Sequence, residues 1–217
     1  MRISGGRSEQ GVVFGNTYDK YGSRNPVVRA LMRGFTRGLE ALVDRAAPAS
    51  IHEVGCGEGY WGLRWARRGV PYRGTDFSAG AIDYARANAG GAGVDPDVFS
   101  VRSVYDLSPE ADGADLVVCC EVLEHLDDPR TALARLEAVS GRHLILSVPR
   151  EPLWRVLNVA RGAYLSEWGN TPGHVQHWSR RGFVRFVSTA APAFEIVDHR
   201  APLPWTLVLC RRRAPRS

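Results

Sequence analysis

Hydrophobic positions along the middle of the chain predict strands that alternate with helices. Short apolar runs bounded by turn residues are typical of buried strands, whereas apolar residues that recur every three or four positions indicate an amphipathic helix. The expected strands are 50–54, 71–75, 97–104, 115–120 and 143–148. The expected helices between them are 60–68, 78–89 and 130–139. Because such alternation produces right-handed crossovers, this region predicts a parallel, doubly wound sheet.

The flanking segments predict a helix before the sheet and a hairpin after it. Residues 11–47 show one apolar face and are expected to form an N-terminal helical lid. Residues 151–182 break the alternation and predict a small insertion on the substrate side after the fifth strand. A further helix is expected at 180–190, where the insertion ends. Residues 194–199 and 205–211 predict an antiparallel C-terminal hairpin. The fold expected for 1–217 is therefore a single α/β domain, Rossmann-like, with a mostly parallel seven-stranded sheet.

Composition narrows the class of protein. Hydrophobic residues make up 44% and charged residues 24% of the 217 residues, which is typical of a soluble globular protein. The net charge of +5 comes from arginine, because Lys20 is the only lysine, and no basic run is interleaved with aromatics. We therefore expect a small-molecule partner rather than nucleic acid. The four cysteines lack Cys-x-x-Cys spacing, and no apolar stretch is long enough to span a membrane, so we expect the protein to be cytoplasmic. We expect it to be a monomer or a homodimer.

Four consecutive strands end in residues suited to a cationic nucleoside ligand. Ligands of doubly wound sheets bind at the carboxyl ends of the strands. The first strand ends in the loop 53–59, and the next three end in Asp76, Asp106 and Glu121. Glycines allow close approach of the backbone to a ligand. An acid after the second strand can accept hydrogen bonds from ribose hydroxyls, Asp106 can accept one from an adenine amino group, and Tyr105 or Phe77 can cover the ring.

The loop departs from the pattern of nicotinamide dinucleotide folds. Those folds prefer G-x-G-x-x-G, and Tyr60 stands where the last glycine would be. At Glu53-Val54-Gly55-Cys56-Gly57-Glu58-Gly59 the sequence resembles the class I S-adenosylmethionine-dependent methyltransferases, whose donor loop reads E/D-x-G-x-G-x-G. Residues 115–129, DLVVCCEVLEHLDDP, resemble the fourth-strand signature of the small-molecule branch that includes ubiquinone-pathway O-methyltransferases.

The resemblance implies S-adenosylmethionine as co-substrate and a set of donor contacts. The tyrosines Tyr18 and Tyr21 align with an N-terminal lid over the donor in such enzymes, although ordinary aromatic packing explains them equally well. The expected donor-binding residues are Glu53, Gly55, Gly57, Gly59, Asp76, Phe77, Tyr105, Asp106, Glu121, Tyr18 and Tyr21.

Three histidines are candidates for a general base, because imidazole titrates near neutral pH. They are His125, His174 and His177, the last two in a segment after Pro172-Gly173. A metal site is the minority alternative, since Glu121, Glu124 and His125 share one helical face and could ligate a divalent ion together with His177 or His174. The favoured interpretation has no metal: Glu121 contacts the donor, while Glu124 and His125 cap the turn that follows the strand.

The expected function is methyl transfer to a hydroxyl or amine of a small aromatic or lipid-like metabolite. Trp154, Tyr164 and Trp168 in the insertion predict an apolar acceptor pocket, unless they only pack the insertion onto the sheet. Two alternatives remain. The Glu-x-x-Glu-His cluster resembles that of small-RNA 3′-terminal 2′-O-methyltransferases, which suggests a metal-assisted RNA enzyme, although Trp178-Ser179-Arg180 departs from their Phe-Glu-Trp. A donor-binding protein without catalysis is the other.

Overall fold

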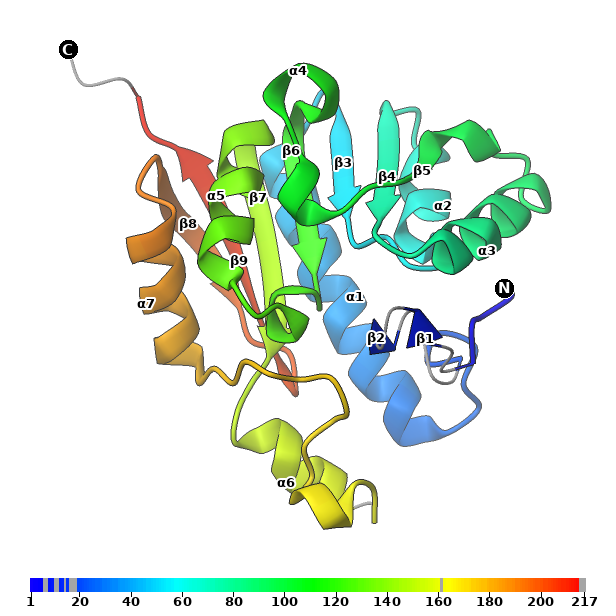
Figure 1. The fold of residues 1–217 in the computed structure, drawn as a ribbon, viewed down its shortest axis with the longest axis vertical. Coiled ribbons are helices and arrows are strands. Elements are labelled where there is room, and N and C mark those ends of the chain that lie inside the picture. Colours follow the sequence, from blue (N-terminus) through cyan, green and yellow to red (C-terminus); the bar gives the residue numbers. More distant parts are fainter. Residues whose placement is uncertain (6–7, 10–11, 14, 16–18, 161, 215–217) are drawn as a thin grey trace.

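The fold was analysed in a computed structural model, which describes the chain apart from residues 6–7, 10–11, 14, 16–18, 161 and 215–217. Its centre is a seven-stranded sheet in the order β5-β4-β3-β6-β7-β9-β8 (Figure 1). Pairing is parallel from β5 to β7 and antiparallel for β7 with β9 and β9 with β8. The strands are β3 (Ile51–Val54), β4 (Tyr72–Asp76), β5 (Phe99–Val101), β6 (Ala114–Cys120), β7 (Ser140–Pro149), β8 (Phe194–Arg200) and β9 (Trp205–Arg212). The predicted fold class is confirmed.

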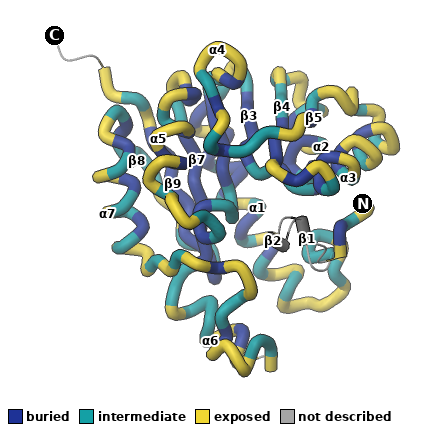
Figure 2. The backbone as a smooth tube through the Cα atoms, viewed as in Figure 1, coloured by how far each residue is buried: buried dark blue, intermediate teal, exposed yellow. Residues whose placement is uncertain are grey.

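Helices cover both faces of this sheet, so its strands are buried between two layers (Figure 2). The α-helices are α1 (Pro26–Ala46), α2 (Tyr60–Ala66), α3 (Ala79–Gly90), α4 (Pro109–Asp112), α5 (Pro129–Val139), α6 (Leu153–Ala160) and α7 (Arg180–Ala190). The 3-10 turns are η1 (Pro96–Val98), η2 (Val104–Asp106), η3 (Leu123–His125) and η4 (Leu165–Glu167).

Alternate residues of the central strands point to opposite layers. Leu116 and Val118 of β6 pack with α1 and α2, whereas Val117 and Cys119 pack with α5 and α7. Side chains of a strand alternate between faces, so a strand covered on both faces needs apolar residues at every position. This requirement explains the uninterrupted apolar run that ends at Cys120.

The N-terminal helix is shorter than the sequence pattern suggested. The predicted helix began at residue 11, whereas α1 begins at Pro26, and β1 (Ser8–Glu9) and β2 (Val12–Val13) form a small antiparallel hairpin before it. The start is fixed by Asn25, whose side chain accepts hydrogen bonds from the amides of Val27 and Val28, and by Pro26 at the first helical position.

The third predicted strand is also shorter, since 97–104 was expected and β5 covers only Phe99–Val101. Asp95 accepts a hydrogen bond from the amide of Asp97 before the strand, and Ser103 accepts one from the amide of Tyr105 after it. Local side-chain bonds of this kind compete with strand pairing and turn the chain into η1 and η2.

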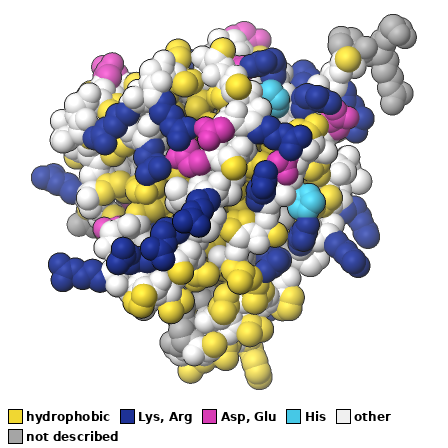
Figure 3. Space-filling view, turned by 180° about the vertical axis from the view of Figure 1, so that it is seen from behind, with side chains coloured by type: hydrophobic (Ala, Val, Ile, Leu, Met, Phe, Trp, Pro, Cys, Tyr) yellow, Lys and Arg dark blue, Asp and Glu magenta, His cyan; other side chains and the backbone are white. Residues whose placement is uncertain are grey.

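The insertion after β7 carries α6 and η4 and projects from the end of the molecule near the start of α1 (Figure 1). Exposed apolar side chains gather on it, as the view from behind shows, while arginines are spread over the body of the molecule with acidic residues among them (Figure 3). Within the described residues, no helix has the length and apolar character needed to cross a membrane.

Candidate active site

The glycine loop between β3 and α2 contains one position that opens onto free space. Gly55, Gly57 and Gly59 all have positive φ, at 78°, 53° and 83°. A Cβ added to Gly55 would lie 2.2 Å from Cγ2 of Val122, and one added to Gly59 would lie 2.9 Å from the ring of Phe99. A Cβ on Gly57 would meet no atom of the described residues within 4 Å. Packing therefore requires Gly55 and Gly59, whereas Gly57 leaves backbone accessible to a ligand.

Asp76, at the end of β4, connects this loop to the neighbouring strand. One carboxylate oxygen accepts a hydrogen bond from the amide of Gly57 and the other from the amide of Ser78, both at 3.0 Å. The side chain is 8% exposed. Because the order of strands reverses between β3 and β6, the loop and Asp76 border the crevice where ligands of such sheets bind.

Glu53, the acid at the start of the glycine motif, is bonded inside the protein. The hydroxyl of Tyr72 donates to its Oε2 at 2.6 Å, and the residue is 3% exposed. Burial raises the pKa of Glu53 to about 8. The hydrogen bond from Tyr72 acts to lower this pKa, whereas the nearby charge of Asp76 acts to raise it. The side chain is therefore protonated at neutral pH. Its predicted contact with a donor stays a prediction.

Replacing Glu53 with glutamine should change how stability depends on pH. An acid whose pKa is raised by folding contributes stability that is complete below its unfolded pKa, near 4.5, and is lost as pH rises toward its folded pKa, near 8. We expect Glu53→Gln, which keeps an acceptor for Tyr72, to resemble wild type at pH 4.5 and to exceed its free energy of unfolding at pH 8. Urea unfolding at both pH values checks this difference; an equal difference at both values would contradict it.

The two aromatic candidates for covering an adenine ring occupy different environments. Tyr105 packs against the apolar cluster beneath α5, and its hydroxyl donates to the carbonyl of Asp128 at 3.3 Å. Phe77 follows Asp76 directly and is 38% exposed. Asp106, at the end of η2, is exposed as well. Of the two rings, Phe77 is the more exposed, whereas Tyr105 is half-buried.

Glu121 begins the turn after β6 in a strained conformation. Its φ of 60° is unusual for a residue other than glycine and costs about 1–3 kcal/mol, which surrounding bonds must offset. Ser147 Oγ donates to Oε1 at 3.0 Å, and Trp205 Nε1 donates to Oε2 at 2.7 Å. Burial raises the pKa of Glu121 to about 6, against the charge of Lys20 and these two hydrogen bonds. The carboxylate thus ties β6 to β7 and β9.

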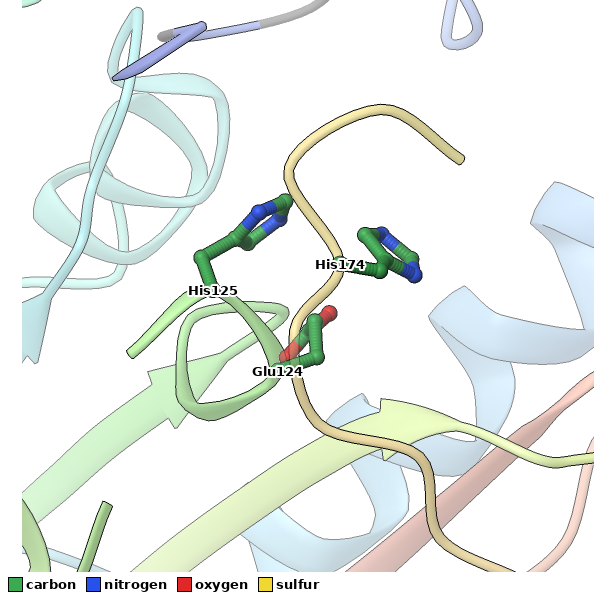
Figure 4. Close-up of side chains that lie close together, drawn as sticks. All are labelled: Glu124, His125 and His174. Carbon is green, nitrogen blue, oxygen red and sulfur yellow. The ribbon is translucent and has the colours of Figure 1, made fainter. Parts of the chain in front are cut away.

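Glu124, His125 and His174 form a compact cluster beside that turn (Figure 4). One candidate ligand atom from each lies within 4.8 Å of the others. The His125 and His174 rings meet edge to face, with centroids 4.7 Å apart. The carbonyl of Glu124 accepts from the amides of Val175 and Gln176 at 2.9 and 3.0 Å. These bonds hold the segment that carries His174 against η3.

The cluster presents a neutral imidazole nitrogen. Nδ1 of His125 lies 2.9 Å from the carbonyl oxygen of Gly173. A carbonyl only accepts, so Nδ1 carries the proton and Nε2 is the basic nitrogen. Burial lowers the pKa of His125, and it lowers that of His174 to about 3. Both rings are therefore uncharged at neutral pH, as a general base must be.

Glu124 is the least satisfied member of the cluster. It is 1% exposed, and within the described part of the chain neither carboxyl oxygen has a hydrogen-bond partner. Burial and the nearby charge of Glu121 raise its pKa well above the usual range. A divalent ion could bind to this carboxyl together with the two imidazoles. The structure does not bring the other suggested ligands into the group, because Glu121 is bonded to Ser147 and Trp205, and Nε2 of His177 lies 2.8 Å from Oδ1 of Asn170.

The N-terminal segment lies over these strand ends. Tyr21 stacks on Tyr60, the first residue of α2, with ring centroids 3.5 Å apart and an interplanar angle of 10°. Ser4 donates from its amide and hydroxyl to Oε1 of Glu58 in the glycine loop, at 3.1 and 2.9 Å. The other predicted lid residue, Tyr18, lies outside the described residues. Both contacts place Ser4 and Tyr21 beside the glycine loop, and the role of this segment as a lid stays a prediction.

Comparisons with known proteins match this geometry. A family described as "Methyltransferase domain" matches residues 52–140. The ubiquinone biosynthesis O-methyltransferase of Xanthomonas axonopodis pv. citri is 33% identical over 134 residues, which cover 59% of this chain and 56% of that protein. That of Aeromonas salmonicida is 31% identical over 118 residues, 53% of this chain and 50% of that protein. Residues 52–140, which include the glycine loop, are thus similar to methyltransferase domains.

Solved structures of methyltransferases show the same fold at low sequence identity to this chain. Magnesium protoporphyrin IX methyltransferase from Synechocystis PCC 6803, with bound S-adenosylhomocysteine, has a TM-score of 0.67 at 18% identity and covers 91% of this chain and 94% of its own. The methyltransferase domain of bacterial CtHen1 has a TM-score of 0.64 at 16% identity, covering 83% and 99%. The chain spans about half the length of the curated relatives it matches.

The matched region contains only part of the site. The glycine loop, Asp76 and the η3 residues Glu124 and His125 lie inside residues 52–140, the region that matches the family. His174 lies outside it. The sequence analysis considered His174 both as a base and as a possible metal ligand beside Glu124 and His125, and the structure brings these three residues together.

Proposed function

We propose that the protein transfers a methyl group from S-adenosylmethionine to a hydroxyl of a small aromatic or lipid-like molecule. The single observation that carries the proposal is the pairing of an open glycine position, Gly57, with the neutral Nε2 of His125 at the carboxyl edge of one sheet. The Synechocystis neighbour binds S-adenosylhomocysteine on the same fold, which supports this donor.

The donor would lie along the loop, with its ribose toward Asp76 and its adenine toward Phe77 and Asp106. Although Asp76 already accepts two amide hydrogen bonds, a carboxylate has about four acceptor sites and retains capacity for ribose hydroxyls. An acidic site also suits a sulfonium, which is a cation. The open space at Gly57 leaves room for a ligand against the loop backbone.

The proposed methyl transfer requires the donor and the acceptor to be aligned, and it requires a base that removes the proton of the acceptor hydroxyl. The hydroxyl proton passes to Nε2 of His125, the oxygen forms a bond to the methyl carbon, and the carbon–sulfur bond breaks with its electron pair left on sulfur. His174 fixes the plane of the His125 ring through their edge-to-face contact, and Gly173 fixes its tautomer. In such a displacement, most of the rate enhancement comes from positioning the two reactants and excluding water.

Aromatic residues lie beside the His174 ring, where the proposed acceptor would bind. Trp154 of α6 lies 6.1 Å from the His174 ring and 5.8 Å from Trp205, centroid to centroid. Its Nε1 donates to Thr171, which links α6 to the segment that carries His174. Trp168, in contrast, is 83% exposed on the far part of the insertion. The names of the ubiquinone-pathway relatives support an acceptor with a hydroxylated ring.

Release of S-adenosylhomocysteine tests the proposal. The protein would be incubated with S-adenosylmethionine and a panel of hydroxylated aromatic compounds, and the product measured by chromatography. Acceptor-dependent release is the expected result. Binding of S-adenosylmethionine without release from any small acceptor would favour a donor-binding protein, whereas release only with RNA, falling steeply with salt, would favour the RNA enzyme.

A further inference from the structure

Residues 1–4, which we call the latch, are hydrogen-bonded to helix α3 and to the glycine loop (Figure 1). The amide of Arg2 donates to Oδ1 of Asn88 in α3 at 2.8 Å, and Nδ2 of Asn88 donates to the carbonyl of Arg2 at 2.9 Å. The amide and the hydroxyl of Ser4 both donate to Oε1 of Glu58, at 3.1 and 2.9 Å. Ser4 is 4% exposed and Glu58 is 2% exposed, so this end of the latch is buried.

Asn88 binds the latch and the glycine loop at the same time. Besides its two bonds to Arg2, its Nδ2 donates to the carbonyl of Glu58 at 3.0 Å. A side-chain amide has two N–H donors and an acceptor oxygen, so a single asparagine can make all three bonds. Gly15 packs against the same group, because a Cβ added to it would lie 2.6 Å from Oγ of Ser4 and would also overlap the Glu58 carboxylate. The latch, Asn88 and Glu58 therefore form one hydrogen-bonded unit.

Glu58 lies in the part of the loop that would contact the methyl donor. It stands between Gly57, the open position, and Gly59, and both glycines have positive φ. Asp76 holds the loop on one side of Glu58 by accepting a hydrogen bond from the amide of Gly57. The bonds from Asn88 and Ser4 hold Glu58 itself. The latch therefore helps to fix the loop backbone against which the donor would lie.

We propose that docking of the latch and binding of the methyl donor stabilise each other. A loop that is already held in its bound conformation costs less to order when the ligand arrives. Release of the latch would take hydrogen-bond donors away from the buried carboxylate of Glu58 and would loosen the loop. Asn88 is the positioning residue that carries this coupling. The inference rests on the proposed function and adds a means of regulating its donor site, since anything that displaces residues 1–4 would weaken donor binding.

Thermodynamic linkage makes the proposal quantitative. The factor by which the docked latch raises the affinity for the donor must equal the factor by which the bound donor stabilises the docked latch. Couplings between two sites are typically about 5-fold to 150-fold. We expect a factor of about ten here, and the two directions can be measured separately.

Hydrogen exchange of the Ser4 amide measures one direction in the wild-type protein. Its bond to Glu58 must break for exchange to occur, so the exchange rate followed by NMR reports the open fraction of the latch. Saturation with S-adenosylhomocysteine should slow this exchange about tenfold. The amide of Gly182 is the matched control, because its bond to Oγ of Ser179 at the start of α7 is also 3.1 Å long, and its exchange rate should not change.

Asn88→Ala measures the other direction. The substitution removes three hydrogen bonds from the unit, and alanine favours the helix, so α3 should be kept. Calorimetric titration should show a Kd for S-adenosylhomocysteine about tenfold above that of wild type. Asp83→Ala, which changes an exposed polar residue of the same helix, should keep the wild-type Kd.

A double-mutant cycle tests whether both ends of the latch act together. Ser4→Ala removes the hydroxyl bond to Glu58, and in the Asn88→Ala background it should cause no further loss of affinity, because the latch is already released. Additive losses, equal Kd values for Asn88→Ala and Asp83→Ala, or Ser4 exchange unchanged by saturating S-adenosylhomocysteine would each overturn the coupling. Failure of wild type to bind S-adenosylhomocysteine would instead contradict the proposed function.

Discussion

Gly57→Leu is expected to abolish binding of S-adenosylmethionine while the protein remains folded. A Cβ at this position meets no atom of the described residues within 4 Å, so a leucine side chain would extend into the space assigned to the donor. We expect a loss of about 3 kcal/mol or more in binding free energy, which is roughly a hundredfold in Kd. Isothermal titration calorimetry measures it.

Gly69→Leu provides the matched control for backbone strain. Gly69 follows α2 and has a φ of 73°, and a Cβ added there would likewise meet no atom within 4 Å in the part of the chain that the structure describes. Leucine at either position should cost about 1–2 kcal/mol of stability because the left-handed conformation is strained. Both variants should therefore unfold at lower urea, and only Gly57→Leu should lose the donor. Equal affinity in the two variants would show that the glycine loop does not line the donor site.

His125→Asn should produce the largest fall in turnover. The asparagine amide can still donate to the carbonyl of Gly173, so the local fold is kept while the basic Nε2 is removed. Loss of a general base lowers kcat by about 100-fold to 10,000-fold. Affinity for S-adenosylhomocysteine should be unchanged. Initial rates with the acceptor identified in the panel provide the measurement.

The pH profile separates a base from a structural residue. Because burial lowers the pKa of His125, its Nε2 stays unprotonated at pH values below those at which a free imidazole is protonated. Wild-type turnover should therefore persist below pH 6.5 and fall only in more acid solution. His199→Asn, which changes an exposed histidine of β8 paired with Arg180, should leave both kcat and the profile unaltered. A comparable loss in both variants would contradict the assignment.

The alternation of strands and helices could be predicted because each element carries its own periodicity. Helix α7 spans 180–190 as expected, since Ser179 caps its start by accepting from the amide of Gly182. The glycine loop was predictable for the same reason, because its spacing is local. The limits of α1 and β5 were missed where single side chains, Asn25 and Ser103, override periodicity.

The arrangement of the site was less accessible from sequence. His174 reaches His125 because the carbonyl of Glu124 accepts hydrogen bonds from residues about 50 positions later in the chain. Backbone contacts of that kind leave no residue pattern. The sequence analysis predicted that Glu121 contacts the methyl donor. It gave no indication that the indole nitrogen of Trp205 in β9 donates a hydrogen bond to the Glu121 carboxylate.

Binding of S-adenosylmethionine to the wild-type protein tests the central claim most directly. Calorimetric titration should show saturable binding of one S-adenosylmethionine per chain, competition by S-adenosylhomocysteine, and no binding of a nicotinamide dinucleotide, whose fold requires a different glycine spacing. Absence of heat with S-adenosylmethionine, or binding of the dinucleotide in its place, would contradict the assignment of the glycine loop as a methyl-donor site.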